Sequence, residues 1–294
     1  MVFGYLIERA LNWGHINATL KEENKIQVVD VVREIDDDLD FKDRVVNMSL
    51  GFNYLVATTT TQCSIYNVVN WDSPAVFDVK EIVTLIVQGS KHFCLLDRSN
   101  GIMLYNYSGS LASNPKYSGL RIEFLNKRFI TLGPDVISIL DTSNPKIIRS
   151  FDISTGKATA TNIEHALEIS DIVLNQTENS NERKIAFLDI NKDLFISPIH
   201  RPALVKISAM VDSFIWNEYN DTLACFADSK LVLWLFPNGV FVDKDLMEQA
   251  KLVKETRDLG KYPQMLCFTN SVIQYRRFDG VLAAINTLPH ASKL

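Results

Sequence analysis

The sequence has few cysteines, and their spacing excludes the common cysteine-based sites. The 294 residues include 4 cysteines, at Cys63, Cys94, Cys225 and Cys267. None of them forms a C-x-x-C pair, the spacing typical of zinc sites and redox centres, and so few cysteines in a chain of this length are not a disulfide framework. We therefore expect these side chains to be buried, reduced thiols.

An excess of positive charge is also missing. The chain has 30 Lys+Arg against 35 Asp+Glu, a formal net charge of -5, and 47% of its residues are hydrophobic. This composition is ordinary for a folded globular protein, and a basic surface that would attract phosphate backbones is not indicated. Nucleic acid is not expected as the main partner.

Long apolar runs are absent as well. The segment Met1–Arg9 has no basic region before its apolar residues, so it is not typical of a secretory signal. The uncharged stretch Val45–Trp71 is long enough to cross a bilayer, but polar residues interrupt it, including Thr58–Thr61 in a row. We expect no membrane insertion, and the alternating pattern of Val46–Leu50 predicts a strand.

Two short segments resemble ligand-binding loops and fail on required residues. Ser154–Lys157 resembles part of a phosphate-binding loop, but Phe151 replaces the first glycine and Ala158 replaces the magnesium-binding hydroxyl. The acidic run Asp36–Asp40 resembles the start of a calcium loop, but Phe41 replaces its turn glycine and Asn47 its closing glutamate. We interpret that run as a solvated acidic loop.

Catalytic and metal-binding motifs are not visible either. The histidines show no metal-ligand spacing, and they are His15, His92, His165, His200 and His290. No G-x-S-x-G nucleophile motif occurs. We predict no catalytic residue, no cofactor-binding residue, no metal ligand and no cofactor from these motifs.

What the sequence does contain is a repeat of short β-rich runs. We align six of them on an apolar residue of a presumed third strand, at Tyr66, Tyr105, Ile139, Phe195, Trp234 and Tyr275. The spacings are 39, 34, 56, 39 and 41 residues, and four of these five lie near the roughly 40-to-45-residue period of WD-type propeller blades. We attribute the wide spacing to loops at 154–165 and 176–183.

Individual units show the expected strand content. The best-formed one has four predicted strands, at Ser213–Trp216, Thr222–Phe226, Lys230–Phe236 and Gly239–Val242. Two runs near the start, His15–Leu20 and Ile26–Val32, predict strands of a first blade. One segment breaks the β pattern: the spacing of Leu246, Ala250 and Val253 predicts a helix at about 243–257, with Asp243 as its N-cap.

These patterns predict an all-β, WD40-like β-propeller of six to seven degenerate blades with one inserted helix. The first unit and the last, Met265–Thr287, look short of strands, so they either complete one blade together or leave the ring open. Propeller enzymes gather residues from distant blades, so a distributed site stays open at this point.

Stretches along nearly the whole chain carry a resemblance to a known family. They include Asp43-Arg44-Val45, Asn70-Trp71 with Pro74, Arg183 to Phe187 with Asp189, Trp216-Asn217, Trp234, Pro237-Asn238, and Arg276-Arg277 with Asp279-Gly280. In their order and spacing the chain resembles the second WD-repeat propeller of the 80-kDa subunit of intraflagellar transport complex B.

The resemblance implies a protein that is not an enzyme but a non-catalytic scaffold of the particle that carries ciliary cargo, required for ciliary assembly and anterograde transport. It implies other subunits of complex B as partners, and a location in the cilium, the ciliary base and the cytoplasm. The family has two propellers followed by helical repeats that mediate self-association. Here residues 1–289 are expected to form the second propeller and 290–294 a tail, without the first propeller or the repeats.

Two alternatives remain from the sequence. The final tripeptide Ser292-Lys293-Leu294 spells a peroxisomal import signal, which suggests a peroxisome-targeted propeller. A WD-repeat adaptor outside cilia is the other. Partner contacts are expected in the charged loops, which are Glu34–Asp43, Glu178–Lys184 and Lys254–Lys261, although any one of them could simply be a solvated rim.

Overall fold

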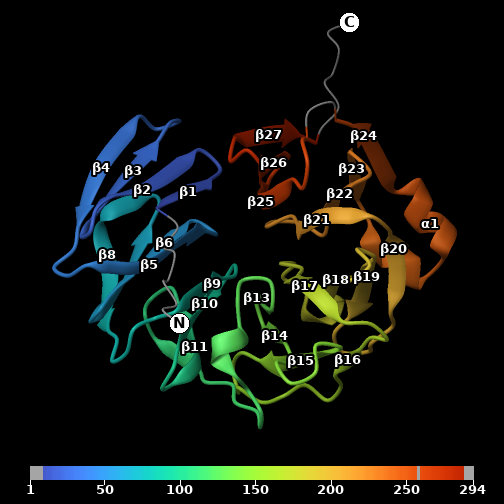
Figure 1. Ribbon diagram of the computed structural model, residues 1–294, viewed down its shortest axis with the longest axis horizontal. Helices are drawn as coiled ribbons and strands as arrows, with labels where there is room; N and C mark the ends of the chain where they lie inside the picture. Colours follow the sequence, from blue (N-terminus) through green and yellow to red (C-terminus); the bar gives the residue numbers. More distant parts are fainter. Residues whose placement is uncertain (1–8, 257–258, 288–294) are drawn as a thin grey trace, which may run out of the picture. The chain divides into compact units, whose positions relative to one another are not determined.

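The computed structural model describes residues 9–256 and 259–287. These residues form seven antiparallel sheets, each built from strands that are consecutive in the sequence (Figure 1). The described part contains one short α-helix besides a few turns of 3₁₀ helix. The fold is a seven-bladed β-propeller, which confirms the predicted class.

By its internal contacts the chain divides into two compact units. The first unit contains the residues up to Asn144 together with Ile148–Ala160, and the second contains Pro145–Ile147 and the residues from Thr161 onward. The chain passes between the units within the fourth sheet.

The first unit holds the sheets β1 to β4, β5 to β8, β9 to β12 and most of the fourth sheet. The first two sheets consist of β1 (Ala10–Trp13), β2 (Ile16–Glu22), β3 (Lys25–Asp30), β4 (Ile35–Asp40), β5 (Val45–Gly51), β6 (Tyr54–Thr59), β7 (Gln62–Asn67) and β8 (Asn70–Asp78). The next elements are β9 (Leu85–Gln88), β10 (His92–Asp97), β11 (Gly101–Asn106), β12 (Leu111–Ser113), the 3₁₀ helix η1 (Ile122–Phe124), β13 (Ile130–Leu132), β14 (Val136–Leu140) and β15 (Ile147–Asp152).

The second unit holds the last strand of the fourth sheet and the three sheets that follow. Its elements are β16 (Ile163–Glu164), β17 (Ile169–Leu174), η2 (Ser180–Glu182), β18 (Lys184–Asp189), β19 (Leu194–Pro198), β20 (Val205–Ser208), β21 (Val211–Trp216), β22 (Leu223–Ala227), β23 (Lys230–Trp234), η3 (Pro237–Phe241), α1 (Lys244–Gln249), β24 (Lys251–Glu255), β25 (Gln264–Thr269), β26 (Val272–Arg276) and β27 (Leu282–Asn286).

Within each unit, the first strands of successive sheets contact one another. In the first unit β5 contacts both β1 and β9, and in the second β21 contacts both β17 and β25. Four of these first strands carry a register shift against the second strand of their sheet, near Asn47, Asp171, Ser213 and Cys267. An extra residue at this place bends the strand locally, and its recurrence is a structural counterpart of the sequence repeat.

The strand order of the sheets corrects two of the six positions taken as equivalent. Ile139 lies on β14 and Tyr275 on β26, and both strands are second in their sheets rather than third. The other four residues do lie on third strands, and they are Tyr66, Tyr105, Phe195 and Trp234. Second and third strands are both short runs of apolar and β-branched residues, so the sequence pattern did not separate them. The 34- and 56-residue spacings result from this shift.

The sixth sheet differs from the prediction after its third strand. Gly239–Val242, predicted as the fourth strand, lies mostly in the 3₁₀ helix η3, which Pro237 begins. The predicted helix at 243–257 is shorter, Lys244–Gln249, and Asp243 caps it by accepting a hydrogen bond from the Asp245 amide at 3.0 Å. The fourth strand is β24, in which Val253 pairs with Val232. Pairing with an existing sheet edge outweighs the helical spacing of this segment.

The first sheet is also more complete than predicted. It has all four strands, because Asp36–Asp40 is part of the edge strand β4 and not a loop. The last sheet has three strands among the described residues, β25 to β27. The prediction that the first and last units are short of strands is therefore wrong for the first sheet.

The hydrophobic core lies between neighbouring sheets. In the second unit one cluster joins β18 and β19 to β22 and β23, and it contains Trp216 and Trp234, which are 2% and 1% exposed. All four cysteines are free and buried, as predicted. In the described part of the chain no helix has the length and apolar character needed to cross a membrane.

Candidate functional site

A small pocket lies in the first unit between the edge strand β4 and strands β7 and β8. Its cavity volume is about 240 Å³. We call it the acidic pocket, and it is lined by Asp37, Asp38, Leu39, Asp40, Tyr66, Trp71, Asp72 and Pro74. It therefore combines residues of the outer strand β4 of one sheet with residues of the last two strands of the next sheet, β7 and β8.

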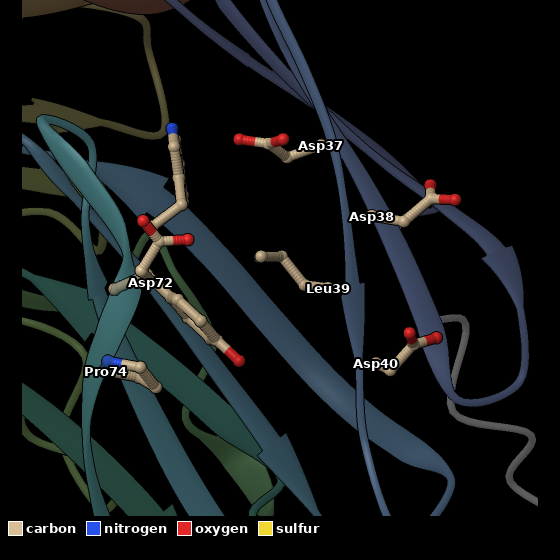
Figure 2. A pocket seen from close by; sticks show the side chains of 8 residues that line it. Asp37, Asp38, Leu39, Asp40, Asp72 and Pro74 are labelled. Atoms are coloured by element: carbon tan, nitrogen blue, oxygen red, sulfur yellow. The ribbon is translucent and has the colours of Figure 1, made fainter.

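Strand alternation decides which way the β4 side chains point. Figure 2 shows Asp37 and Leu39 directed toward β8, where Asp72 and Pro74 lie, while Asp38 and Asp40 are directed to the other side of β4. Successive side chains of a strand face opposite ways, so only alternate carboxylates of the run can face β8. The acidic pocket thus has carboxylates on both of its walls.

The carboxylates facing away from β8 already have partners on β3. Lys25 Nζ lies 3.4 Å from Asp38 Oδ2 and 3.5 Å from Asp40 Oδ1. The charge of Asp40, followed by the charge and hydrogen bond of Asp38, raises the pKa of Lys25. One neighbouring lysine is therefore shared by two carboxylates, while Asp37 and Asp72 are exposed and have no ion pair with any described residue.

Aromatic side chains supply the apolar part of the lining. Tyr66 and Trp71 are 7% and 6% exposed, and their ring centroids are 6.3 Å apart. Phe41 meets Tyr66 edge to face at 6.1 Å. Burial, and after it the charge of Asp40, raises the pKa of Tyr66, so its hydroxyl stays neutral at physiological pH.

One polar group beside this pocket is unsatisfied. The indole Nε1 of Trp71 is buried and makes no hydrogen bond within the described residues. An indole N–H can only donate, and buried donors normally find an acceptor. The acidic pocket therefore has an excess of negative charge, and Trp71 in its lining has a buried donor that lacks an acceptor among the described residues.

The first of the charged segments expected to contact partners, Glu34–Asp43, contributes one wall of this pocket. It was expected as a loop, and it is mainly a strand because its backbone pairs with β3 from Lys25 to Asp30. The sequence pattern could not predict that Tyr66, Trp71 and Asp72 lie beside this strand, because their position depends on how β4 packs against the next sheet. The acidic run itself was the available signal.

The last two residues of the second charged segment, Glu178–Lys184, are buried and hydrogen-bonded. Arg183 and Lys184 are 0% and 1% exposed. Arg183 Nη1 donates to the Asn175 carbonyl at 2.6 Å, and Lys184 Nζ lies 2.6 Å from Asp221 Oδ2. These two charges are satisfied inside the second unit, so they are not available to a partner.

Other sequence features have structural roles or lie outside the described part. In the third charged segment, 254–261, residues 257 and 258 lie outside the described part of the chain. The whole terminal tripeptide 292–294 also lies outside it. His165 lies 3.3 Å from Asp189 and packs against the rings of Phe187 and Phe195. Within the described ranges, no group of three or more His, Cys, Asp or Glu side chains is placed to hold a metal ion.

The sequence matches a known family over almost its full length. The family model described as IFT80 second beta-propeller matches residues 8–290. The chain is 35% identical over 301 aligned residues to proteins named Intraflagellar transport protein 80 homolog from Rattus norvegicus and from Mus musculus. Each alignment covers 100% of this chain and 39% of the relative, so the chain spans about two fifths of the length of these curated relatives.

Solved structures support the fold. A chain of the structure titled Crystal Structure of Mitotic Checkpoint Complex matches with a TM-score of 0.59 at 12% identity, covering 97% of this chain and 93% of that one. Hsv2p of Kluyveromyces lactis matches with a TM-score of 0.55 at 9% identity, covering 89% and 86%. At such identities these likenesses concern the fold alone.

Proposed function

Because the chain belongs to the IFT80 second β-propeller family, we propose that it is a non-catalytic scaffold of the intraflagellar transport complex B particle. In this role it contributes to ciliary assembly and anterograde transport through contacts with other subunits of the particle. The observation that carries the proposal is the family match over residues 8–290 together with 35% identity to relatives named for intraflagellar transport.

The surface of the chain is suited to protein contacts. Edge strands such as β4 and β24 offer backbone groups and side chains to a neighbouring protein. Propeller folds commonly serve as rigid platforms of this kind. We propose residues 1–289 as the propeller domain and 290–294 as a tail, and we propose that the chain acts at the ciliary base and along the cilium.

Microscopy and co-purification test the proposal. The chain is tagged at its N-terminus so that Leu294 stays free, and it is expressed in ciliated cells. We expect signal at the ciliary base and along the axoneme, with recovery of complex B subunits. Diffuse signal without these subunits contradicts the proposal and favours an adaptor outside cilia.

A matched variant addresses the peroxisomal alternative, which the comparisons do not support. The same tagged chain without residues 292–294 should behave identically to the full chain. Peroxisomal puncta that disappear in the shortened variant would instead establish the terminal tripeptide as a working signal and overturn the ciliary assignment.

A further inference from the structure

The acidic pocket has the chemistry of a cation-binding site on a protein surface. Four aspartates belong to its lining, but only Asp37 and Asp72 direct carboxylates to the gap between β4 and β8, because Asp38 and Asp40 point to the other side of β4 and pair with Lys25. A cation placed between Asp37 and Asp72 would meet two carboxylates that have no ion pair with any residue the structure describes. Charge complementarity therefore points to a positively charged occupant.

The shape and lining indicate what kind of cation fits. At about 240 Å³ the cavity is smaller than the roughly 300–1,000 Å³ typical of cofactor and drug-sized sites. Rings of Tyr66 and Trp71 line it, and a guanidinium stacks on aromatic faces while pairing with carboxylates. A metal ion fits less well, because no cluster of ligands within the described ranges has the required arrangement.

The unsatisfied indole N–H of Trp71 adds a second, independent observation. It is a buried donor without an acceptor among the described residues. A guanidinium cannot accept a hydrogen bond, but the backbone carbonyl of a peptide that carries it can. The charge of the pocket is therefore matched by a basic peptide segment, whereas the buried Trp71 donor becomes available to a peptide carbonyl only when a side chain that covers it moves.

We propose that the acidic pocket binds an arginine side chain carried by a basic segment of a neighbouring protein. That this neighbour is a subunit of the transport particle rests on the proposed function, whereas the chemistry of the pocket does not. Asp37 on β4 and Asp72 on β8 hold the guanidinium from two sides, and Tyr66 and Trp71 provide the surface against which it packs.

Fluorescence anisotropy with the purified chain tests the binding. The probe is a fluorescein-labelled peptide of alternating serine and arginine with three arginines, and its twin carries neutral citrulline at those positions. We expect saturable binding of the arginine peptide that weakens as salt is raised, and no binding of the twin. Equal binding of both peptides, or no saturable binding, overturns the proposal.

Paired variants locate the site. The double variant Asp37→Asn, Asp72→Asn removes the two unpaired carboxylates, and we expect it to weaken binding about fivefold to thirtyfold. The control Asp36→Asn, Asp78→Asn removes the same charge from the same two strands, outside the pocket lining, and should change binding less than about twofold. All four residues are exposed, so the fold should tolerate both changes.

The outcomes separate this proposal from the proposed function. Equal weakening by both double variants would mean diffuse attraction to an acidic surface, and it would overturn the pocket. A chain that passes the peptide tests but is not recovered with complex B overturns the proposed function and leaves the pocket standing. A pocket variant that loses the peptide and is still recovered normally with complex B overturns the assignment of the neighbour to the particle.

Discussion

At the scale of single residues, the second unit contains a buried ammonium group, that of Lys184, whose counter-charge on Asp221 can be removed by a single substitution. Lys184 is 1% exposed at its side chain, and its ammonium lies 2.6 Å from Asp221. Burial lowers the pKa of Lys184, and the charge of Asp221 opposes that effect. Asn175 adds a hydrogen bond to the other oxygen of Asp221 at 2.9 Å.

We predict that Asp221→Asn lowers the free energy of unfolding by about 3 to 5 kcal/mol, because it leaves the Lys184 ammonium buried without its counter-charge. Urea denaturation followed by tryptophan fluorescence measures the loss. Within the same unit, Lys192 and Asp212 form an exposed ion pair at 2.8 Å. The control Asp212→Asn should cost at most about 1 kcal/mol. Similar losses in the two variants would show that Lys184 does not depend on Asp221.

The sequence could predict only that part of the acidic pocket whose residues stand out by their type. The run Asp36–Asp40 stands out as acidic in the sequence alone, and the prediction that it is not a calcium loop rests on Phe41 and Asn47 in the places of the turn glycine and the closing glutamate. Trp71 and Asp72 have no such local signal. Their role depends on the packing of β8 beside β4, which is a long-range property of the fold.

At the scale of elements, the segment after β23 shows where local pattern and tertiary structure compete. The cap residue Asp243 was predicted from sequence, and it does begin the helix α1. The helix nevertheless ends at Gln249, because the residues from Lys251 onward pair with the edge of β23. Helical spacing of a few apolar residues is a weak signal beside a full strand of backbone hydrogen bonds.

We predict that Asp243→Ala destabilises the protein by about 0.5 to 2 kcal/mol, since it removes the carboxylate that accepts the Asp245 amide. Thermal unfolding followed by circular dichroism measures this effect as a lowered midpoint. Asp243→Asn keeps a side-chain oxygen at the cap, so it should retain most of the stability. A loss in the asparagine variant equal to that in the alanine variant would contradict the capping role.

Strand existence was easier to predict than strand order. Four of the six aligned runs were assigned correctly as third strands, whereas those of Ile139 and Tyr275 were not. Alternation and β-branched residues identify a strand, but second and third strands of a sheet are built from similar short apolar runs and look alike in the sequence. The position within the sheet became visible only through pairing.

At the scale of the whole molecule, buried titratable groups link stability to alkaline pH. Burial raises the pKa of the thiols of Cys63, Cys94 and Cys225, the last to about 12. Burial likewise raises the pKa of Tyr105 and Tyr117. The folded protein keeps these protons at a pH where the unfolded chain loses them, so the unfolded state is favoured as pH rises.

We therefore predict full stability near neutral pH and a decline that begins at about pH 8.5 to 9, where unfolded thiols ionise. Each buried thiol contributes up to about 1.4 kcal/mol per pH unit above that point until its folded pKa is reached. Lys184 acts in the opposite direction, because its pKa is lowered in the folded protein and its titration therefore favours the folded state as pH rises. It is one group against several thiols and tyrosines. Urea midpoints measured between about pH 7 and pH 11 follow the effect.

The variant Cys225→Ala serves as the comparison for the alkaline decline. It removes one buried thiol, so its stability should fall less steeply with pH than that of the unchanged chain, although its stability at neutral pH is lower because of the lost packing. Parallel pH profiles in the two proteins would contradict the assignment of the decline to buried thiols.

The bulge shared by β5, β17, β21 and β25 has a consequence for how such chains can diverge. Removing one residue there would shift the register of the strand and exchange its inward and outward side chains. Substitutions that keep the apolar alternation leave the register intact. Over evolutionary time these four strands should therefore tolerate many changes of residue type but few changes of length, and insertions and deletions should accumulate in the connections between strands.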